Sequence, residues 1–225
     1  PGKDVLTIEN LCCESRRGVE ALKNVSLNVR AGEILGICGV DGNGQSELVR
    51  CITGLQKPSG GCVRINGAET TRAKPRDILR CGVSHIPEDR HKMGIVATMS
   101  VNDNLILMDY NAMAFCNKGF LNGRRIRARN QELCAAYEVK AGSLDDSMRT
   151  LSGGNQQKCV VGRELARKPK LLIAMHPSRG LDVGATKYIQ NEIVRARDEK
   201  TAVLLVSTEL EEILELSDRI LVLFE

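Results

Sequence analysis

The stretch GVDGNGQSEL (residues 39–48) has the glycine spacing of a loop that binds phosphate groups. In the pattern G-x-x-x-x-G-K-[ST], backbone N–H groups surround the phosphates and the lysine reaches the β- and γ-phosphates. Gly39, Gly44 and Ser46 occupy their positions in the pattern, but the lysine position holds Gln45. The backbone cradle does not depend on the lysine, so the loop is a candidate nucleotide site, with an ordinary glycine-rich turn as the alternative.

The residues around the loop predict the elements that such a site needs. EILGIC (33–38) is an almost continuous apolar run, typical of a buried strand, and SELVRCITGL (46–55) has helical periodicity. The order strand, glycines, helix is the context of a phosphate loop. The dinucleotide pattern G-x-G-x-x-G fits less well, because after Gly42 and Gly44 its third glycine would stand where the chain has Glu47.

A second motif, LSGGNQQK (151–158), has the residue types of a helix start that approaches a phosphate. Ser152 is suited to cap the following helix, and Gly153 and Gly154 let backbone N–H groups come close to an anion. An ordinary Ser-Gly-Gly helix cap is the simpler interpretation, but the phosphate loop upstream argues against it.

The remaining apolar runs predict an α/β fold with a mostly parallel sheet. LLIAM (171–175), AVLLVS (202–207) and ILVLF (220–224) are buried-strand runs separated by amphipathic helices, and we expect them beside EILGIC in one sheet. The glycine loop should then lie at the carboxyl edge of that sheet. VLTIEN and VSLNVR near the N-terminus alternate like half-buried strands, whereas residues 100–150 favour helices over strands.

The composition excludes several classes of protein. A chain of 225 residues with 42% hydrophobic residues can bury a core, and its net charge of +4 does not demand nucleic acid or a membrane. Aromatic residues make up 3% and tryptophan is absent, which argues against a base-stacking surface. No apolar run approaches the ~20 residues of a membrane span. The nine cysteines, without a C-x-x-C pair, favour a reducing cytoplasm.

Taken together, the motifs resemble the ATP-binding domains of ABC transporters, and the resemblance covers the whole chain. LSGGNQQK resembles the family's signature sequence, HIPEDR (85–90) its glutamine loop, LLIAMHP (171–177) its Walker B strand, GLD (180–182) its D-loop and LLVSTELEE (204–212) its switch-histidine segment. The resemblance implies a P-loop ATPase core with a mostly parallel sheet, an N-terminal antiparallel β portion and a helical subdomain. It implies ATP with Mg²⁺ as the cofactor, bound by Gly39, Gly42, Asn43, Gly44, Gln45, Ser46, Glu47 and Glu88.

Six positions of this implied site depart from the family pattern. Gln45 replaces the lysine, Glu47 replaces a hydroxyl residue and Glu88 stands where the glutamine is expected. Met175 falls at the Walker B Asp position, His176 at the catalytic Glu position and Thr208 at the switch histidine position. An adenine-stacking aromatic is also missing near Arg16. We therefore expect no catalytic residue in this site and weak nucleotide binding, with Ser46 and Glu88 as the only candidate metal contacts.

The resemblance is to the second, C-terminal ATPase half of bacterial subunits that import nucleosides or ribose-type sugars. Such domains work as head-to-tail pairs, which implies that the signature residues act in trans on the partner's ATP: Ser152, Gly153, Gly154, Gln156 and Asp182. The implied partners are a second ATPase domain and membrane-spanning permease subunits, without direct nucleic acid. This places the chain in the cytoplasm, on the inner face of the membrane.

The implied domain has a core at about 1–95 and 158–225 and a helical lobe at about 96–157, and we expect the chain to be part of a longer two-domain subunit. The lobe contains four clustered arginines, interpreted as a solvated helix face: Arg124, Arg125, Arg127 and Arg129. Two other functions stay open. One is a soluble ABC protein acting on nucleic acid or ribosomes, and the other is a structural or regulatory nucleotide-binding module that does not contribute to hydrolysis.

Overall fold

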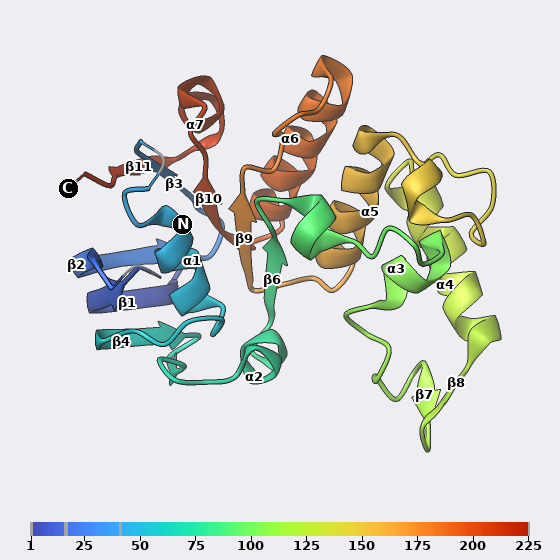
Figure 1. Cartoon of the computed structure of the whole chain (residues 1–225), viewed down its shortest axis with the longest axis horizontal. Coiled ribbons are helices and arrows are strands. Elements are labelled where there is room, and N and C mark those ends of the chain that lie inside the picture. Colours follow the sequence, from blue (N-terminus) through green and yellow to red (C-terminus); the bar gives the residue numbers. More distant parts are fainter. Residues whose placement is uncertain (1, 16–17, 41, 225) are drawn as a thin grey trace. The chain divides into compact units, whose positions relative to one another are not determined.

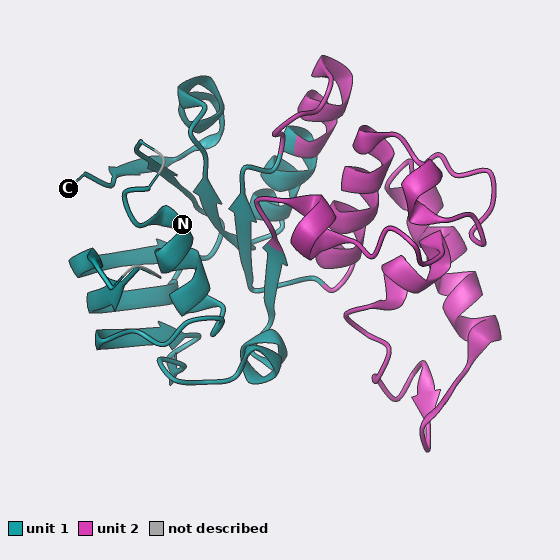
Figure 2. Cartoon of the chain, viewed as in Figure 1, with its two compact units in different colours: residues 1–85, 168–177, 190–225 teal, residues 86–167, 178–189 magenta. Residues whose placement is uncertain are grey.

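The computed structural model describes residues 2–15, 18–40 and 42–224. Within these ranges the chain forms two compact units: unit 1 comprises residues 1–85, 168–177 and 190–225, and unit 2 comprises 86–167 and 178–189 (Figure 2). Unit 2 contains the helical lobe predicted at 96–157 and is larger than that prediction. Arg16, near the expected adenine-stacking position, and Asp41 of the glycine loop lie outside the described residues.

A five-stranded sheet in the order β11-β3-β10-β9-β6 forms the centre of unit 1 (Figure 1). Its strands are β3 (Ile34–Cys38), β6 (Val83–Ile86), β9 (Leu171–Met175), β10 (Ala202–Val206) and β11 (Arg219–Val222). β10 pairs in parallel with both β3 and β9, and β11 pairs in parallel with β3. The predicted adjacency of the four apolar runs is confirmed. β3, β9 and β10 are buried, as continuous apolar runs predict, but β11 is the edge strand, and its Ile220 and Val222 are 40% and 65% exposed.

The N-terminal strands form a separate antiparallel sheet in the order β2-β1-β4-β5. Its strands are β1 (Asp4–Glu14), β2 (Glu20–Arg30), β4 (Gly60–Ile65) and β5 (Ala68–Glu69). Ile8 of β1 lies between Leu27 and Val63 of its two neighbours, and all three side chains are buried. This sheet is the predicted antiparallel portion, and its alternating sequence leaves one face apolar.

The apolar core of unit 1 holds the helix that follows the phosphate loop. Three helices belong wholly to this unit: α1 (Gln45–Ile52), α2 (Pro75–Arg80) and α7 (Leu210–Leu216). Leu48 and Ile52 of α1 share one apolar cluster with Ile37 of β3 and Leu204 of β10, and all four are fully buried. Full burial of such a side chain contributes about 1.5–3 kcal/mol, so the start of α1 is anchored firmly to the sheet.

Unit 2 is mainly helical. Its helices are α3 (Val101–Ile106), α4 (Gly123–Ala136) and α5 (Gly153–Leu165), with a π-helical turn at Arg90–Gly94 and a 3-10 turn at Met148–Thr150. The first residues of α6 (Val183–Asp198) also belong to it. Residues 100–150 are not purely helical, since a short hairpin of β7 (Cys116–Asn117) and β8 (Phe120–Leu121) joins α3 to α4.

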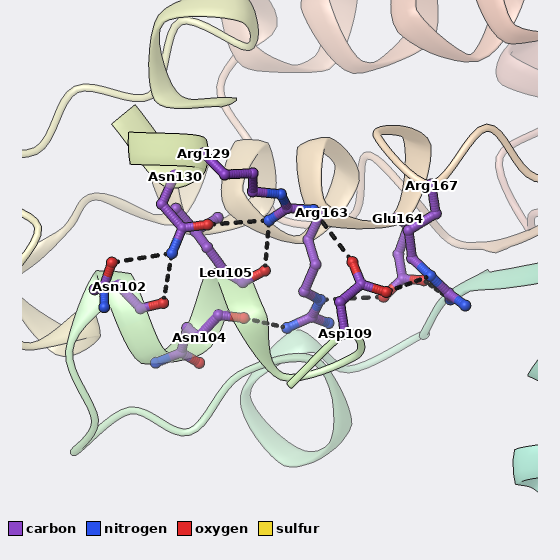
Figure 3. A network of polar contacts seen from close by, with 9 residues as sticks. All are labelled: Asn102, Asn104, Leu105, Asp109, Arg129, Asn130, Arg163, Glu164 and Arg167. Carbon is purple, nitrogen blue, oxygen red and sulfur yellow. Dashed lines mark hydrogen bonds and ion pairs between the residues drawn. The ribbon is translucent and has the colours of Figure 1, made fainter. Parts of the chain in front are cut away.

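A network of charged and amide side chains joins the three helices of unit 2 (Figure 3). Arg163 of α5 is 4% exposed and donates hydrogen bonds to the Asn104 and Gly94 carbonyls and to Glu164, each at 3.0–3.1 Å. The Asp109 carboxylate bridges Arg129 and Arg167 at 3.2 Å each. Buried charges are tolerated only when paired, so this network holds the helices in one arrangement.

The cysteines are free thiols in the part of the chain that the structure describes. Burial raises the pKa of Cys51 and of Cys159 to about 12, so these thiols stay protonated and act as small apolar side chains. Among the described residues, no helix has both the length and the apolar character to cross a lipid bilayer.

Candidate functional site

Three parallel strands of unit 1 bring the predicted site positions to one edge of the sheet. In the strand register, Val206 of β10 lies beside Met175 of β9 and beside Ile37 of β3. The backbone continues this pairing past the strands, because the His176 N–H donates to the Val206 carbonyl at 2.8 Å. The glycine loop, His176 and Thr208 therefore follow neighbouring carboxyl ends, where open α/β sheets bind ligands.

Two glycines of the described part of the glycine loop occupy positions that exclude a side chain. Gly44, the residue before α1, has φ 91°, and a Cβ there would lie 2.4 Å from the Ala21 carbonyl oxygen. A Cβ on Gly39 would lie 2.6 Å from the Leu223 carbonyl oxygen. Only glycine fits these two positions. No side chain caps α1, so the N–H groups of its first turn remain available to an anion.

Gln45 lies inside this loop as a neutral side chain. It is 7% exposed, and its Nε2 donates to the Val40 carbonyl at 3.1 Å. Asn43 also forms hydrogen bonds within the protein: its N–H donates to the Val40 carbonyl, and its side-chain amide donates to the Leu223 carbonyl. The position that supplies an ammonium group to phosphates in a complete phosphate loop supplies no charge here.

Glu47 and Ser46 follow in the first turn of α1. The Glu47 carboxylate lies 3.8 Å from the Arg50 guanidinium, one turn along the helix, and its side chain is 14% exposed. A carboxylate in the first turn of a helix is stabilised by the helix dipole, which accounts for its presence without a catalytic role. Ser46 is half-buried and keeps the one hydroxyl group of the loop pattern.

The residues at the end of β9 do not fit a magnesium site. Met175 is 5% exposed, belongs to the apolar core, and offers a thioether where Mg²⁺ prefers oxygen ligands. Within the described residues, no group of three or more His, Cys, Asp or Glu side chains is arranged to hold a metal ion. Of the two candidate contacts, Ser46 belongs to unit 1, and Glu88 of unit 2 is ion-paired with Arg179 at 3.1 Å.

His176 and Thr208 contact each other, which the sequence did not reveal. His176 has a left-handed backbone with φ 44°, is 6% exposed, and accepts a hydrogen bond on Nδ1 from the Thr208 N–H at 3.4 Å. This contact joins the end of β9 to the loop after β10.

The signature residues of unit 2 begin α5 as predicted. Ser152 is the N-cap, and its Oγ accepts from the Asn155 N–H at 3.4 Å and from the Asn155 side-chain amide at 3.0 Å. Gly153 and Gly154 are the first two residues of the helix. Their N–H groups belong to the first turn, which has no intrahelical acceptors for them.

Arg90 is a residue of this site to which the sequence reading gave no role. A Cβ on Gly153 would lie 3.0 Å from Arg90 Nη2, so the guanidinium lies directly against the start of α5. Arg90 Nη1 donates to the Arg179 carbonyl at 3.1 Å, and the Arg179 side chain pairs with Glu88. A cation and a helix N-terminus both attract anions, so the two add in the same direction. The motif IPEDR contains this arginine, but contact with Gly153 requires the fold.

Two further signature positions have structural partners in unit 2. A Cβ on Gly154 would lie 3.0 Å from the Ala185 Cβ, so this glycine lets α5 and the start of α6 approach each other. Asp182 is exposed, and its Oδ1 accepts from the Ala185 N–H at 2.9 Å, which caps α6.

Gln156 points into unit 2. It is 5% exposed, and its Nε2 donates to the Met148 carbonyl at 3.1 Å and to the Leu151 carbonyl at 3.2 Å. This side chain holds the turn that precedes Ser152. The geometry therefore suits it to positioning the signature rather than to touching another molecule.

Comparison with known proteins gives one consistent family. The family described as "ABC transporter" matches residues 22–178. The guanosine import ATP-binding protein NupO of Bacillus subtilis and the nucleoside import ATP-binding protein NupA of Lactococcus lactis are each 45% identical over 225 residues, which is 100% of this chain and 44% of each relative. The chain thus spans less than half the length of these relatives.

The fold agrees with solved structures. A dimeric bacterial ABC transporter cassette superposes with a TM-score of 0.81 at 24% identity, over 97% of this chain and 94% of that chain. With a family match over more than half of its residues, the chain belongs to the ABC transporter family, as an ATP-binding domain.

Proposed function

We propose that this chain is the ATP-binding domain of an importer of nucleosides or ribose-type sugars, and that it completes the ATP site of a partner domain. In this proposal its own glycine loop binds nucleotide weakly and does not hydrolyse it. The observation that carries the proposal is the contrast between the two sites. The start of α5 retains the serine and the two glycines of the signature, while the catalytic positions around the glycine loop hold other residue types.

The loss of hydrolysis in this site rests on three side chains. Phosphoryl transfer depends on charges placed around the γ-phosphate and on a positioned water molecule. Gln45 supplies no charge, Met175 offers no oxygen ligand, and the Nδ1 lone pair of His176 is used by the Thr208 N–H. The cradle of backbone N–H groups remains, so weak binding of ATP phosphates is retained.

The role in trans rests on the start of α5. Ser152 caps the helix, Gly153 and Gly154 expose backbone N–H groups, and Arg90 adds a guanidinium against Gly153. These groups would bind the γ-phosphate of ATP held by a second ATPase domain, in a head-to-tail pair. Asp182 would lie at the same junction, and Gln156 would hold the turn behind it.

The remaining partners follow from the family and its relatives. NupO and NupA are named as import ATP-binding proteins for guanosine and for nucleosides, which supports a nucleoside or a ribose-type sugar as the solute. Membrane-spanning permease subunits would hold the domain on the cytoplasmic face of the membrane, and Mg²⁺ would accompany ATP in the partner's site. In this role the chain itself has no direct contact with nucleic acid.

The first test is steady-state phosphate release by purified residues 1–225 in the presence of Mg-ATP. We expect almost no turnover, because charge, metal ligand and base are all replaced. A rate of about 1 s⁻¹ or above, as for ordinary enzymes, would contradict the proposal.

A further inference from the structure

The hairpin that joins α3 to α4 presents large apolar side chains to solvent. Met113 is 94% exposed, Phe120 82%, Leu121 54% and Tyr110 53%. All four lie within residues 110–121, and the hairpin extends away from the helices of its own unit (Figure 1). A group of exposed apolar side chains of this kind marks a site of interaction.

The same segment is strongly basic. Residues 110–131 contain five Lys or Arg residues and no Asp or Glu. Two of the arginines have internal partners: Arg127 pairs with Asp145 at 2.8 Å, and Arg129 pairs with Asp109 at 3.2 Å. The other three are exposed and have no carboxylate within ion-pair distance among the described residues: Lys118, Arg124 and Arg125.

The base of the hairpin contacts the helices of unit 2, whereas its tip is exposed. Lys118 and Gly119 form a two-residue turn with φ 48° and 87°, and the Asn122 N–H donates to the Phe115 carbonyl at 2.8 Å. The Phe115 ring lies under the Arg129 guanidinium, 6.0 Å from it, and Arg129 belongs to the buried network of Figure 3. The base of the hairpin is therefore joined to the helices of unit 2, while the apolar side chains of its tip are exposed.

From this juxtaposition we propose that the 110–125 segment is a contact site for an anionic lipid surface. Phe120, Leu121 and Met113 enter the boundary between headgroups and acyl chains, and Lys118, Arg124 and Arg125 bind the anionic headgroups. Apolar side chains flanked by cations are the chemistry that membrane surfaces select. A nucleic acid would use the cations but would leave the aliphatic side chains of Met113 and Leu121 in water.

The test is co-sedimentation of residues 1–225 with vesicles of phosphatidylcholine alone and of phosphatidylcholine with phosphatidylglycerol, without nucleotide. We expect binding only to the vesicles with phosphatidylglycerol. Lys118→Glu/Arg124→Glu/Arg125→Glu should weaken it about 100-fold, since each cation contributes a factor of about five. Phe120→Ser/Leu121→Ser should weaken it about tenfold or more at unchanged charge.

Two control variants test whether vesicle binding depends on the hairpin itself or only on the net charge and the exposed apolar surface of the chain. Arg72→Glu/Lys74→Glu/Arg76→Glu makes the same change of net charge at another exposed basic segment, and Leu214→Ser removes a 61% exposed leucine from α7. Both should bind the anionic vesicles like the unmodified chain. All these positions are exposed, and a thermal melt of each variant checks that it folds.

Three outcomes would overturn the lipid proposal. They are no binding of the unmodified chain to anionic vesicles, equal losses in the hairpin and control variants, and hairpin-dependent binding of a single-stranded oligonucleotide without vesicle binding. None of these outcomes bears on ATP turnover, so the lipid contact and the role in the ATP site are tested separately.

Discussion

At the residue scale, the two nucleotide-related sites differ in what their side chains are free to do. Around the glycine loop, Gln45 Nε2 and His176 Nδ1 form hydrogen bonds with backbone groups of the protein itself. At the start of α5, the backbone N–H groups of Gly153 and Gly154 and the guanidinium of Arg90 lie together. The first arrangement stabilises a loop, and the second attracts an anion.

A lysine at position 45 should improve binding without restoring hydrolysis. Gln45→Lys introduces an ammonium group beside the cradle, and a charge-assisted hydrogen bond to phosphate of about 1.5–3 kcal/mol corresponds to roughly ten- to hundredfold tighter ADP binding. Turnover should stay near zero, because Met175 and His176 are unchanged. Calorimetric titration with ADP and phosphate release measure the two effects. Turnover of about 1 s⁻¹ in this variant would show that the missing lysine alone silences the site.

At the element scale, β6 contains a histidine that makes stability depend on pH. His85 Nε2 is buried and has no hydrogen-bond partner among the described residues, and burial lowers the pKa of His85 from 6.5 to about 4. The folded chain resists protonation of this ring, whereas the unfolded chain accepts the proton below pH 6.5. The free energy of unfolding should therefore fall as the pH drops from about 6.5 toward 4.

The comparison of His85→Leu with the unmodified chain isolates this effect. Between about pH 7 and pH 4.5 the unmodified chain should lose about 2 kcal/mol more unfolding free energy than the variant. Urea unfolding at both pH values measures the difference, and carboxylate titrations common to both chains cancel. Parallel losses in the two chains would rule out His85 as the source.

The buried network of unit 2 should be sensitive to the loss of a single arginine. Arg163→Leu removes the guanidinium that lies 3.1 Å from the fully buried Glu164 carboxylate, to which Arg167 lies 3.9 Å away. Loss of one partner from a buried pair costs about 3–5 kcal/mol of unfolding free energy.

The matched control for Arg163 is Arg127→Leu. It breaks the exposed pair of Arg127 with Asp145, and such exposed pairs contribute only about 0.2–1 kcal/mol. Denaturant unfolding of both variants compares the two costs. If Arg163→Leu were no more destabilising than Arg127→Leu, the network would not be what holds α3, α4 and α5 together.

At the scale of the whole molecule, local patterns predicted the elements, and tertiary contacts decided what the side chains do. The four adjacent strands, the glycine loop before α1 and the Ser152 cap could be predicted because each depends on a run of neighbouring residues. The placement of Arg90 against Gly153 and the hydrogen bond between His176 and Thr208 join segments tens of residues apart. No periodicity encodes such contacts.

Two predictions for unit 2 hold only in part. The arginine cluster was interpreted as a solvated face, yet the Arg129 side chain is 20% exposed and ion-paired with Asp109, while the other three are exposed. The stretch 100–150 was expected to be helical, yet it contains the hairpin of β7 and β8. The turn Lys118-Gly119 lacks the Asn-Gly or Asp-Gly pair that would have indicated such a hairpin.

The most direct test of the central claim compares three variants of the full-length subunit in ATP hydrolysis. Gly153→Asp places a carboxylate beside the N–H groups and within reach of Arg90, so turnover should fall about 100-fold or more. Gln45→Ala should leave turnover nearly unchanged, since it removes a neutral side chain bonded to its own loop. Gly123→Asp makes the same substitution at the start of α4, where a Cβ meets nothing within 4 Å, and should also be silent. Loss of turnover in Gln45→Ala with full activity in Gly153→Asp would show that the glycine loop is the working site and that the signature does not act in trans.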